Sequence, residues 1–261
     1  MTILFMFPGF AIPAEIPEGL GGPPGMTGQK DDSREEPLPK GKELQDQKPP
    51  LPPIPPLYKP PRRGSPGGRV GGGTRGIKDE LITLYVLAPD HVGLTAQPQP
   101  ILYWYLSKLT QYPIEVTIIE DQAIYPILEK QVRIPSQPGI HPIPLADYNV
   151  RLLPGREYWW FVAVVPDADH RSKDILAGGL IEFVKISEEL QAKLAQGDKK
   201  ETFKIYTEEG LWYDALRTIS ELIEAAPNDL LLRKQRASLL EQVRLLEIAA
   251  YDARQEVPTG K

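Results

Sequence analysis

The sequence predicts a mostly β protein: an immunoglobulin-like antiparallel β-sandwich, followed by a C-terminal helical hairpin and preceded by a disordered Pro/Gly-rich tether. Three observations predict this class. Short β-branched and aromatic runs alternate with turn residues over 79–186, the apolar period changes to about 3.6 after residue 187, and the 29 prolines and 22 glycines crowd into the first third of the 261 residues. The predicted parts are therefore a leader (1–14), a tether (15–78), a sandwich (79–186) and a helical region (187–254).

The first residues, "MTILFMFPGFAIPAE", form an apolar run shorter than the ~20 residues of a membrane span. They resemble the second half of a signal peptide, with Gly9-Phe10-Ala11 as a small-x-small cleavage pattern but without a basic n-region. We expect export to the periplasm or the medium, and no membrane span anywhere in the chain.

The tether is predicted to lack packed structure from Pro13 to about Gly76. Mixed charges dominate 29–48, and "KPPLPPIPPLYKPP" favours polyproline II. The following segment, "RRGSPGGRVGGGTRGIK", is basic through Arg62, Arg63, Arg69, Arg75 and Lys78. A solvated spacer is the simplest interpretation. The alternatives are a PxxP ligand for an aromatic groove and an Arg-Gly segment that binds RNA.

Seven strands are expected in the sandwich, at spacings typical of antiparallel sheets. They cover 81–89, 100–108, 114–121, 128–135, 140–145, 157–165 and 179–186.

The sixth strand, "EYWWFVAVV", follows a pattern that resembles the tyrosine corner of fibronectin type III and related domains. The pattern consists of Leu152, Pro154, Gly155 and Tyr158. Because side chains alternate along a strand, Tyr158 and Trp160 point inward while Trp159 and Phe161 point to the other face.

That second face is too apolar to leave in water. Burying two aromatics is worth at most about 8–12 kcal/mol, which rivals the stability of a whole domain. The strand "ILYWYLS" is also apolar on both faces. We predict that all of these aromatics belong to the core and that the terminal helices cover the outer face of the strand that holds Trp159 and Phe161.

The helical region carries apolar stripes and also resembles a tetratricopeptide repeat. The matching residues are Tyr206, Gly210, Trp212, Ala215, Leu216 and Pro227. Only one repeat and part of a second fit, whereas such arrays need about three for stability. A hairpin packed on the sandwich is therefore favoured over a freestanding peptide-binding solenoid.

Four blocks in order resemble the bacterial family called domain of unknown function 928: "RRGSPGGRVGGGTRG", "LYVLAPDHVGLTAQPQPILYWYL", "GREYWWFVAVVPDADHRSKDILAGGLIEFV" and "YTEEGLWYDALRTISELIEAAPND". The family is best known from cyanobacteria and usually follows a signal peptide, so the resemblance implies export and a two-part architecture but no activity. Cysteines common in the family are replaced here by residues such as Lys78 and Val165. The resemblance implies that those cysteines pair as a disulfide in other members.

The chain has no cysteine, which excludes disulfides, thiolate nucleophiles and cysteine metal sites. Its net charge of −5 gives no general attraction to nucleic acid or lipid. The histidines His91, His141 and His170 show no metal-binding spacing, no GxSxG elbow occurs, and "GGGTRG" lacks a Walker ending. We expect no cofactor.

The densest polar cluster is "PDADHRSKD" (166–174). Asp167 and Asp169 could supply oxygens to a weak Ca²⁺ site, although the Gly and Glu of an EF-hand are missing. The simplest interpretation is a polar hairpin in which Arg171 pairs with Asp174. The alternative is a partner contact formed by Asp167, Asp169, His170, Arg171 and Asp174.

These features favour a non-enzymatic interaction module of the cell envelope or the secreted space, whose partner is a protein or a glycan. Its binding surface would lie on loops such as 166–174 or in a groove between sandwich and helices. One alternative is a hydrolase of envelope polymers that uses Asp167, Asp169 or Asp174 as paired carboxylates. Another is a cytosolic RNA-associated protein that uses the Arg-Gly tether.

Overall fold

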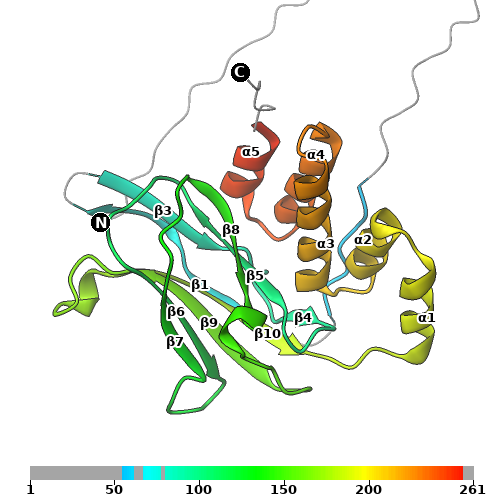
Figure 1. Ribbon diagram of the computed structural model, residues 1–261, viewed down its shortest axis with the longest axis horizontal. Coiled ribbons are helices and arrows are strands. Elements are labelled where there is room, and N and C mark those ends of the chain that lie inside the picture. The colour runs from blue at the N-terminus through cyan, green and yellow to red at the C-terminus, as the bar shows by residue number, and fades with distance from the viewer. Residues whose placement is uncertain (1–54, 62–66, 78–79, 255–261) are drawn as a thin grey trace, which may run out of the picture. The chain divides into compact units, whose positions relative to one another are not determined.

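The computed structural model describes residues 55–61, 67–77 and 80–254. Within them, ten strands are followed by five α-helices (Figure 1). The strands are β1 (Arg69–Gly71), β2 (Gly73–Ile77), β3 (Glu80–Val86), β4 (Gly93–Thr95), β5 (Ile101–Leu106), β6 (Ile114–Glu120), β7 (Leu128–Val132), β8 (Gly139–Pro144), β9 (Glu157–Val164) and β10 (Ile175–Phe183). The helices are α1 (Glu188–Gln196), α2 (Lys199–Glu208), α3 (Trp212–Ala225), α4 (Leu230–Gln242) and α5 (Leu246–Arg254).

The strands form two sheets. The six-stranded sheet has the order β1-β10-β9-β6-β7, with β4 added in parallel to β10, and the four-stranded sheet has the order β2-β3-β5-β8. The seven predicted strands correspond to β3 and β5 through β10. Without the three short additional strands, they give the A-B-E and G-F-C-C′ arrangement of an immunoglobulin-like sandwich. The predicted fold class is confirmed.

The tyrosine pattern has a clear structural role. The hydroxyl of the buried Tyr158 accepts a hydrogen bond from the backbone N–H of Leu153 at 3.2 Å. Gly155 adopts a φ of 73° in the turn between them, a conformation that favours glycine. Trp160 and Val162 follow on the same inward face and are fully buried.

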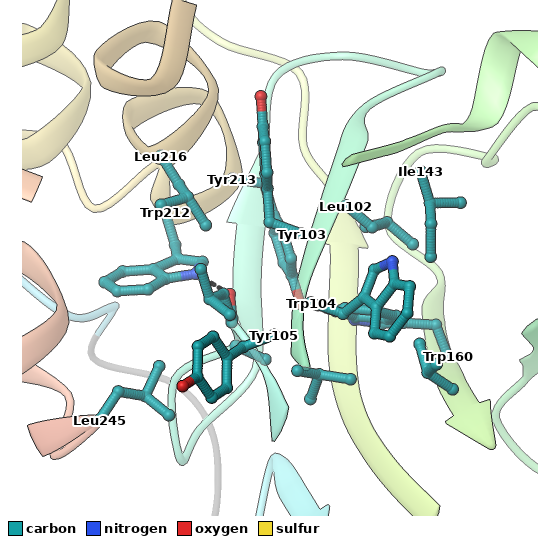
Figure 2. Close-up of a cluster of buried hydrophobic side chains, with 14 of the residues drawn as sticks. Leu102, Tyr103, Trp104, Tyr105, Ile143, Trp160, Trp212, Tyr213, Leu216 and Leu245 are labelled. Carbon is teal, nitrogen blue, oxygen red and sulfur yellow. Dashed lines mark hydrogen bonds between the residues drawn. The ribbon is translucent and has the colours of Figure 1, made fainter. Parts of the chain in front are cut away.

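The helices cover the four-stranded sheet. Along β5, Leu102 and Trp104 lie on the sandwich side, while Tyr103 and Tyr105 lie on the helix side (Figure 2). Helix α3 packs against β4 and β5, and the indole N–H of Trp212 donates to the carbonyl of Leu87 at 2.8 Å. The helical region is thereby joined to the sandwich through a continuous core.

The prediction that the helices cover Trp159 and Phe161 is wrong. Both side chains are only half-buried on the outer face of the six-stranded sheet. Their rings stack on each other with centroids 5.9 Å apart and planes inclined by 13°. The Phe161 ring also lies close over Gly178, where an added Cβ would lie 2.4 Å from it. The two rings are therefore partly shielded without a helix.

The prediction that residues 13–76 lack packed structure is wrong for 55–61 and for the segment from 67 onward. Arg69–Gly71 pairs with β10 and Gly73–Ile77 pairs with β3, so this segment extends both sheets. Backbone hydrogen bonds at open sheet edges stabilise a sequence that has few apolar side chains of its own. The leader and the rest of the tether lie outside the described residues.

Residues 55–61 form a strap over the helices. Tyr58 is only 6% exposed and meets Trp212 edge-on with ring centroids 5.2 Å apart. Its backbone N–H donates to Oε1 of Gln242 at 2.7 Å, and its hydroxyl lies 2.9 Å from Nε2 of His91. A segment expected to be a solvated spacer therefore contributes one side chain, Tyr58, to the core.

The helical region contains two antiparallel pairs, α2–α3 and α4–α5, after the short α1. Gly210, at the α2–α3 turn, has a φ of 74°, and an added Cβ there would lie 2.4 Å from the carbonyl oxygen of Lys59 in the strap. Tyr206, Trp212 and Ala215 are buried. None of the described helices is both long and apolar enough to cross a membrane.

Candidate functional site

The predicted polar loop, 166–174, is held by its own ion pairs. Asp167 contacts Nζ of Lys173 at 2.7 Å and Nδ1 of His170 at 2.8 Å. The hydrogen bond from Lys173 is the main reason that the pKa of Asp167 lies below its ordinary value. Arg171 contacts Asp174 at 2.8 Å and Glu115 at 2.6 Å. The loop is therefore a polar hairpin with the local Arg171–Asp174 pair.

This arrangement does not support chemistry by the loop carboxylates. The oxygens of Asp167 that would bind Ca²⁺ accept hydrogen bonds from the loop itself, including the backbone N–H of Asp169. No group of three metal-ligating side chains occurs within the described part of the chain. Asp167, Asp169 and Asp174 also line neither of the two cavities described below, so these cavities give the hydrolase hypothesis no support.

Among the basic side chains that the sequence placed in the tether, Arg69 has a clear structural role. Nη1 of Arg69 donates to the carbonyl of Ala88 at 2.9 Å and to that of Val243 at 3.3 Å. Arg69 therefore joins β1 to the end of α4. Arg62, Arg63 and Lys78 lie outside the described residues.

A cavity of about 430 Å³, here called the edge cavity, opens between the last strands of the two sheets. Strand β7 ends the six-stranded sheet, β8 ends the four-stranded sheet, and residues 133–138 connect them. The walls combine apolar, proline and a few polar side chains: Trp104, Val132, Arg133, Ile134, Pro135, Ser136, Gln137, His141, Pro142, Ile143, Pro144, Asp147 and Tyr148.

His141 is the main polar group of the edge cavity. Its ring lies 5.2 Å from that of the buried Trp104. Burial lowers the pKa of His141 below its ordinary value, although a hydrogen bond with the backbone of Gln137 opposes this shift. The imidazole is therefore neutral at neutral pH, and its buried Nε2 has no hydrogen-bond partner among the described residues.

Ser136, His141 and Asp147 all line the edge cavity and have the residue types of a hydrolytic triad. No hydrogen bond joins any two of these side chains in the described structure. A triad requires the histidine to contact both the nucleophile and the orienting carboxylate. The present arrangement instead leaves the buried Nε2 of His141 without a hydrogen-bond partner among the described residues.

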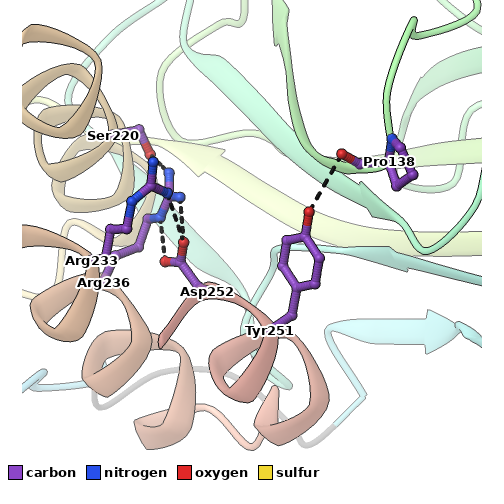
Figure 3. A network of polar contacts seen from close by, with 6 residues as sticks. All are labelled: Pro138, Ser220, Arg233, Arg236, Tyr251 and Asp252. Carbon is purple, nitrogen blue, oxygen red and sulfur yellow. Dashed lines mark hydrogen bonds and ion pairs between the residues drawn. The ribbon is translucent and has the colours of Figure 1, made fainter. Parts of the chain in front are cut away.

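A second cavity, of about 190 Å³, adjoins the first at Gln137 and lies between the β7–β8 connection and helices α4 and α5. We call it the arginine pocket. Its walls are Gln137, Pro138, Gly139, Ile140, Arg233, Arg236, Tyr251 and Asp252. Figure 3 shows the two arginines beside Asp252, and Tyr251 reaching the carbonyl of Pro138 at 3.4 Å.

A buried ion pair forms one wall of the arginine pocket. Arg236 donates from Nε and Nη2 to the two carboxylate oxygens of Asp252, both at 2.7 Å. Its Nη1 donates to Oγ of Ser220 at 3.0 Å. This two-point geometry holds α4, α5 and α3 together and fixes the position of the pocket.

The sequence predicted a groove between sandwich and helices but not its residues. Arg233 and Arg236 look like ordinary charges on the exposed face of a helix, and Asp252 follows them by 16 positions or more. The sequence around His141 shows no metal-binding spacing and gives no other sign of a site. The one signal in the sequence was that Arg233 and Arg236 lie three positions apart, a spacing that places two side chains on the same face of a helix.

Comparison of the chain with known proteins shows a similarity to one protein family. A family model described as Domain of Unknown Function (DUF928) matches residues 70–252, which span the sandwich and the helices that enclose both cavities. A search of curated proteins finds no significant match. Because the matched region covers most of the sequence, the chain belongs to the DUF928 family.

Proposed function

We propose that the chain is a non-enzymatic interaction module, exported to the cell envelope or the medium, that binds a protein or glycan partner at the edge cavity. One observation carries the proposal: a cavity of about 430 Å³ between two strand edges, whose walls combine apolar and polar side chains and include His141, the buried Nε2 of which has no hydrogen-bond partner among the described residues. Ligand sites commonly have volumes of roughly 300–1,000 Å³ and combine apolar walls with a few polar groups.

The position of the edge cavity favours an extended partner. Strands β7 and β8 are each the last strand of their sheet, and edge strands are frequent docking sites for another chain. A partner lying along this side of the sandwich would place a side chain or a sugar ring against Trp104 and His141.

Export is supported by the leader-like first residues and by the resemblance described above. Fractionation of the native host and N-terminal sequencing test this part of the proposal. We expect the protein in the periplasm or the medium, with an N-terminus downstream of Ala11. An intact Met1 on a cytosolic protein would contradict it.

Site-directed photo-crosslinking tests the binding site. A photoreactive residue at the exposed Ser136 position of the full chain, activated in the native host, should yield a discrete adduct with a protein or a glycan. The same residue at the exposed Lys193 position on α1 serves as the control. Ile134→Asp, which places a charge in the cavity wall, should abolish the Ser136 adduct.

The proposal fails if the two positions give the same adducts or if Ile134→Asp leaves the Ser136 adduct unchanged. The non-enzymatic part fails if the purified chain releases reducing ends or peptides from envelope polymers. The Asp167→Asn variant would then show whether the polar loop takes part.

A further inference from the structure

The arginine pocket contains two guanidinium groups and one carboxylate. The carboxylate, Asp252, is 1% exposed and is bound at both oxygens by Arg236. Arg236 uses a third donor on Ser220. This arginine is therefore both neutralised and hydrogen-bonded by the protein.

Arg233 has no comparable partner. Its Nη1 lies 3.7 Å from Oδ1 of Asp252, beyond hydrogen-bond distance. Its Nε is buried and unpartnered within the described part of the chain, and its side chain is only 18% exposed. Among the charged residues that line the pocket, Arg233 is thus one surplus positive charge with unused donors.

Arg233 and Arg236 share one anion, Asp252, which lies closer to Arg236. A mostly buried cation that is incompletely paired is unfavourable, and binding a further anion reduces this cost. The planar guanidinium matches a planar carboxylate through two parallel hydrogen bonds. The surplus of one charge fits a monoanion. The volume of about 190 Å³ suits a carboxylate with a short part of the chain that carries it.

We propose that the arginine pocket binds a carboxylate of the partner through Arg233. The inference rests on the proposed function, because it names the group by which the same partner is recognised. The adjoining edge cavity, which shares Gln137 with the pocket, takes the neighbouring part of the partner. Carboxylates of this kind occur at peptide C-termini and on uronic acids of acidic glycans.

NMR titration of the full chain labelled with ¹⁵N tests the proposal, with the amides of Gly139 and Ile140 as reporters at the pocket wall. The probes are N-acetyl-alanyl-alanine and its C-terminal amide, and galacturonic acid trimer and its methyl ester. At least one acid should shift the two amides and bind at least tenfold more tightly than its neutral counterpart. The acid that does so identifies the source, peptide or glycan.

Arg233→Gln should weaken that acid at least tenfold. The matched control is Lys234→Gln, which removes one positive charge from the next position on α4 and should leave the affinity unchanged. Arg233→Lys keeps the positive charge but loses the planar guanidinium. We expect its loss of affinity for the acid to lie between those of Arg233→Gln and Lys234→Gln. Arg233 makes no short hydrogen bond to Asp252, so its replacement leaves the Arg236–Asp252 pair in place.

The proposal is overturned if each acid binds no better than its neutral counterpart, or if Arg233→Gln behaves like Lys234→Gln. It is also overturned if inorganic phosphate binds more tightly than both acids. These outcomes are distinct from failure of the proposed function. If the Ser136 adduct still forms in the Arg233→Gln variant, the proposed interaction module stands and the carboxylate site is rejected.

Discussion

Strands β5 and β9 both carry large aromatic side chains on their two faces, but helices cover the outer face of β5 only. Each places a tryptophan inside the sandwich, Trp104 and Trp160, and each carries two aromatics on its outer face. The outer pair of β5, Tyr103 and Tyr105, is buried on the side that the helices cover (Figure 2). The outer pair of β9 stays half-exposed. The number of aromatic side chains on the outer face of a strand therefore does not by itself decide whether helices pack against that face.

The polar ends of the side chains explain part of the difference. Burial raises the pKa of Tyr103 to about 12, although the hydroxyl of Ser220 on α3 opposes this shift. Tyr105 meets Tyr251 of α5 edge-on at 5.0 Å. Trp159 and Phe161 instead shield each other by stacking. The tyrosines of β5 therefore meet side chains of α3 and α5, whereas the two outer rings of β9 contact each other.

The largest effect should come from Trp212, the centre of the covered side. Trp212→Ala removes a fully buried side chain and its hydrogen bond to Leu87. We expect the free energy of unfolding to fall by about 3–5 kcal/mol, as for other buried aromatics. Urea denaturation followed by circular dichroism measures it. A loss below that of Trp159→Ala would contradict the assignment of the covered face.

Asp214 gives the covered side a distinct dependence on pH. Burial raises its pKa from 3.8 to about 6, although a hydrogen bond from the backbone of Ala96 opposes this shift. Between these two values the folded state holds a proton that the unfolded state has lost, so this residue's contribution to stability falls as pH rises.

Relative to Asp214→Asn, the wild-type free energy of unfolding should decrease by about 2–3 kcal/mol between pH 4 and pH 6. Denaturant titrations of both proteins across this range measure the difference. A difference that stays constant with pH would show that Asp214 is not buried as described.

Tyr58 tests whether the strap belongs to the covered core. Tyr58→Ala removes the contact with Trp212 and the hydrogen bond with His91, and we expect a loss of about 2 kcal/mol. Leu57→Ala is a matched control, because Leu57 is 67% exposed. Thermal unfolding of both variants provides the comparison. Equal melting temperatures would indicate that the strap is not docked in solution.

The smallest effect should come from the uncovered face. Trp159→Ser removes one ring of the stacked pair and should lower the free energy of unfolding by about 1 kcal/mol. Trp160→Ser, at the next position, removes a fully buried ring bonded to Tyr213 and should cost about 3–5 kcal/mol. Similar losses for the two variants, in the same denaturation experiment, would mean that the outer face is covered after all.

The sequence alone determined the seven main strands of the sandwich, the tyrosine corner and the position of the helical region. These features depend on local signals, namely side-chain alternation, turn residues and the 3.6-residue period, which neighbouring residues carry together. The same signals explain why the loop 166–174 was recognised as a polar hairpin: Arg171 and Asp174 are close in the chain and pair locally.

Only the tertiary structure decided which sheet the helices cover, that residues around Tyr58 and Arg69 are built into the core, and where the cavities lie. These features depend on partners far apart in the sequence, such as Tyr58 with Gln242 or Tyr251 with Pro138. Composition marked the tether as unable to pack by itself, since it has few apolar groups to offset its conformational entropy. Open sheet edges and an exposed helix surface supplied the contacts that its own side chains lack.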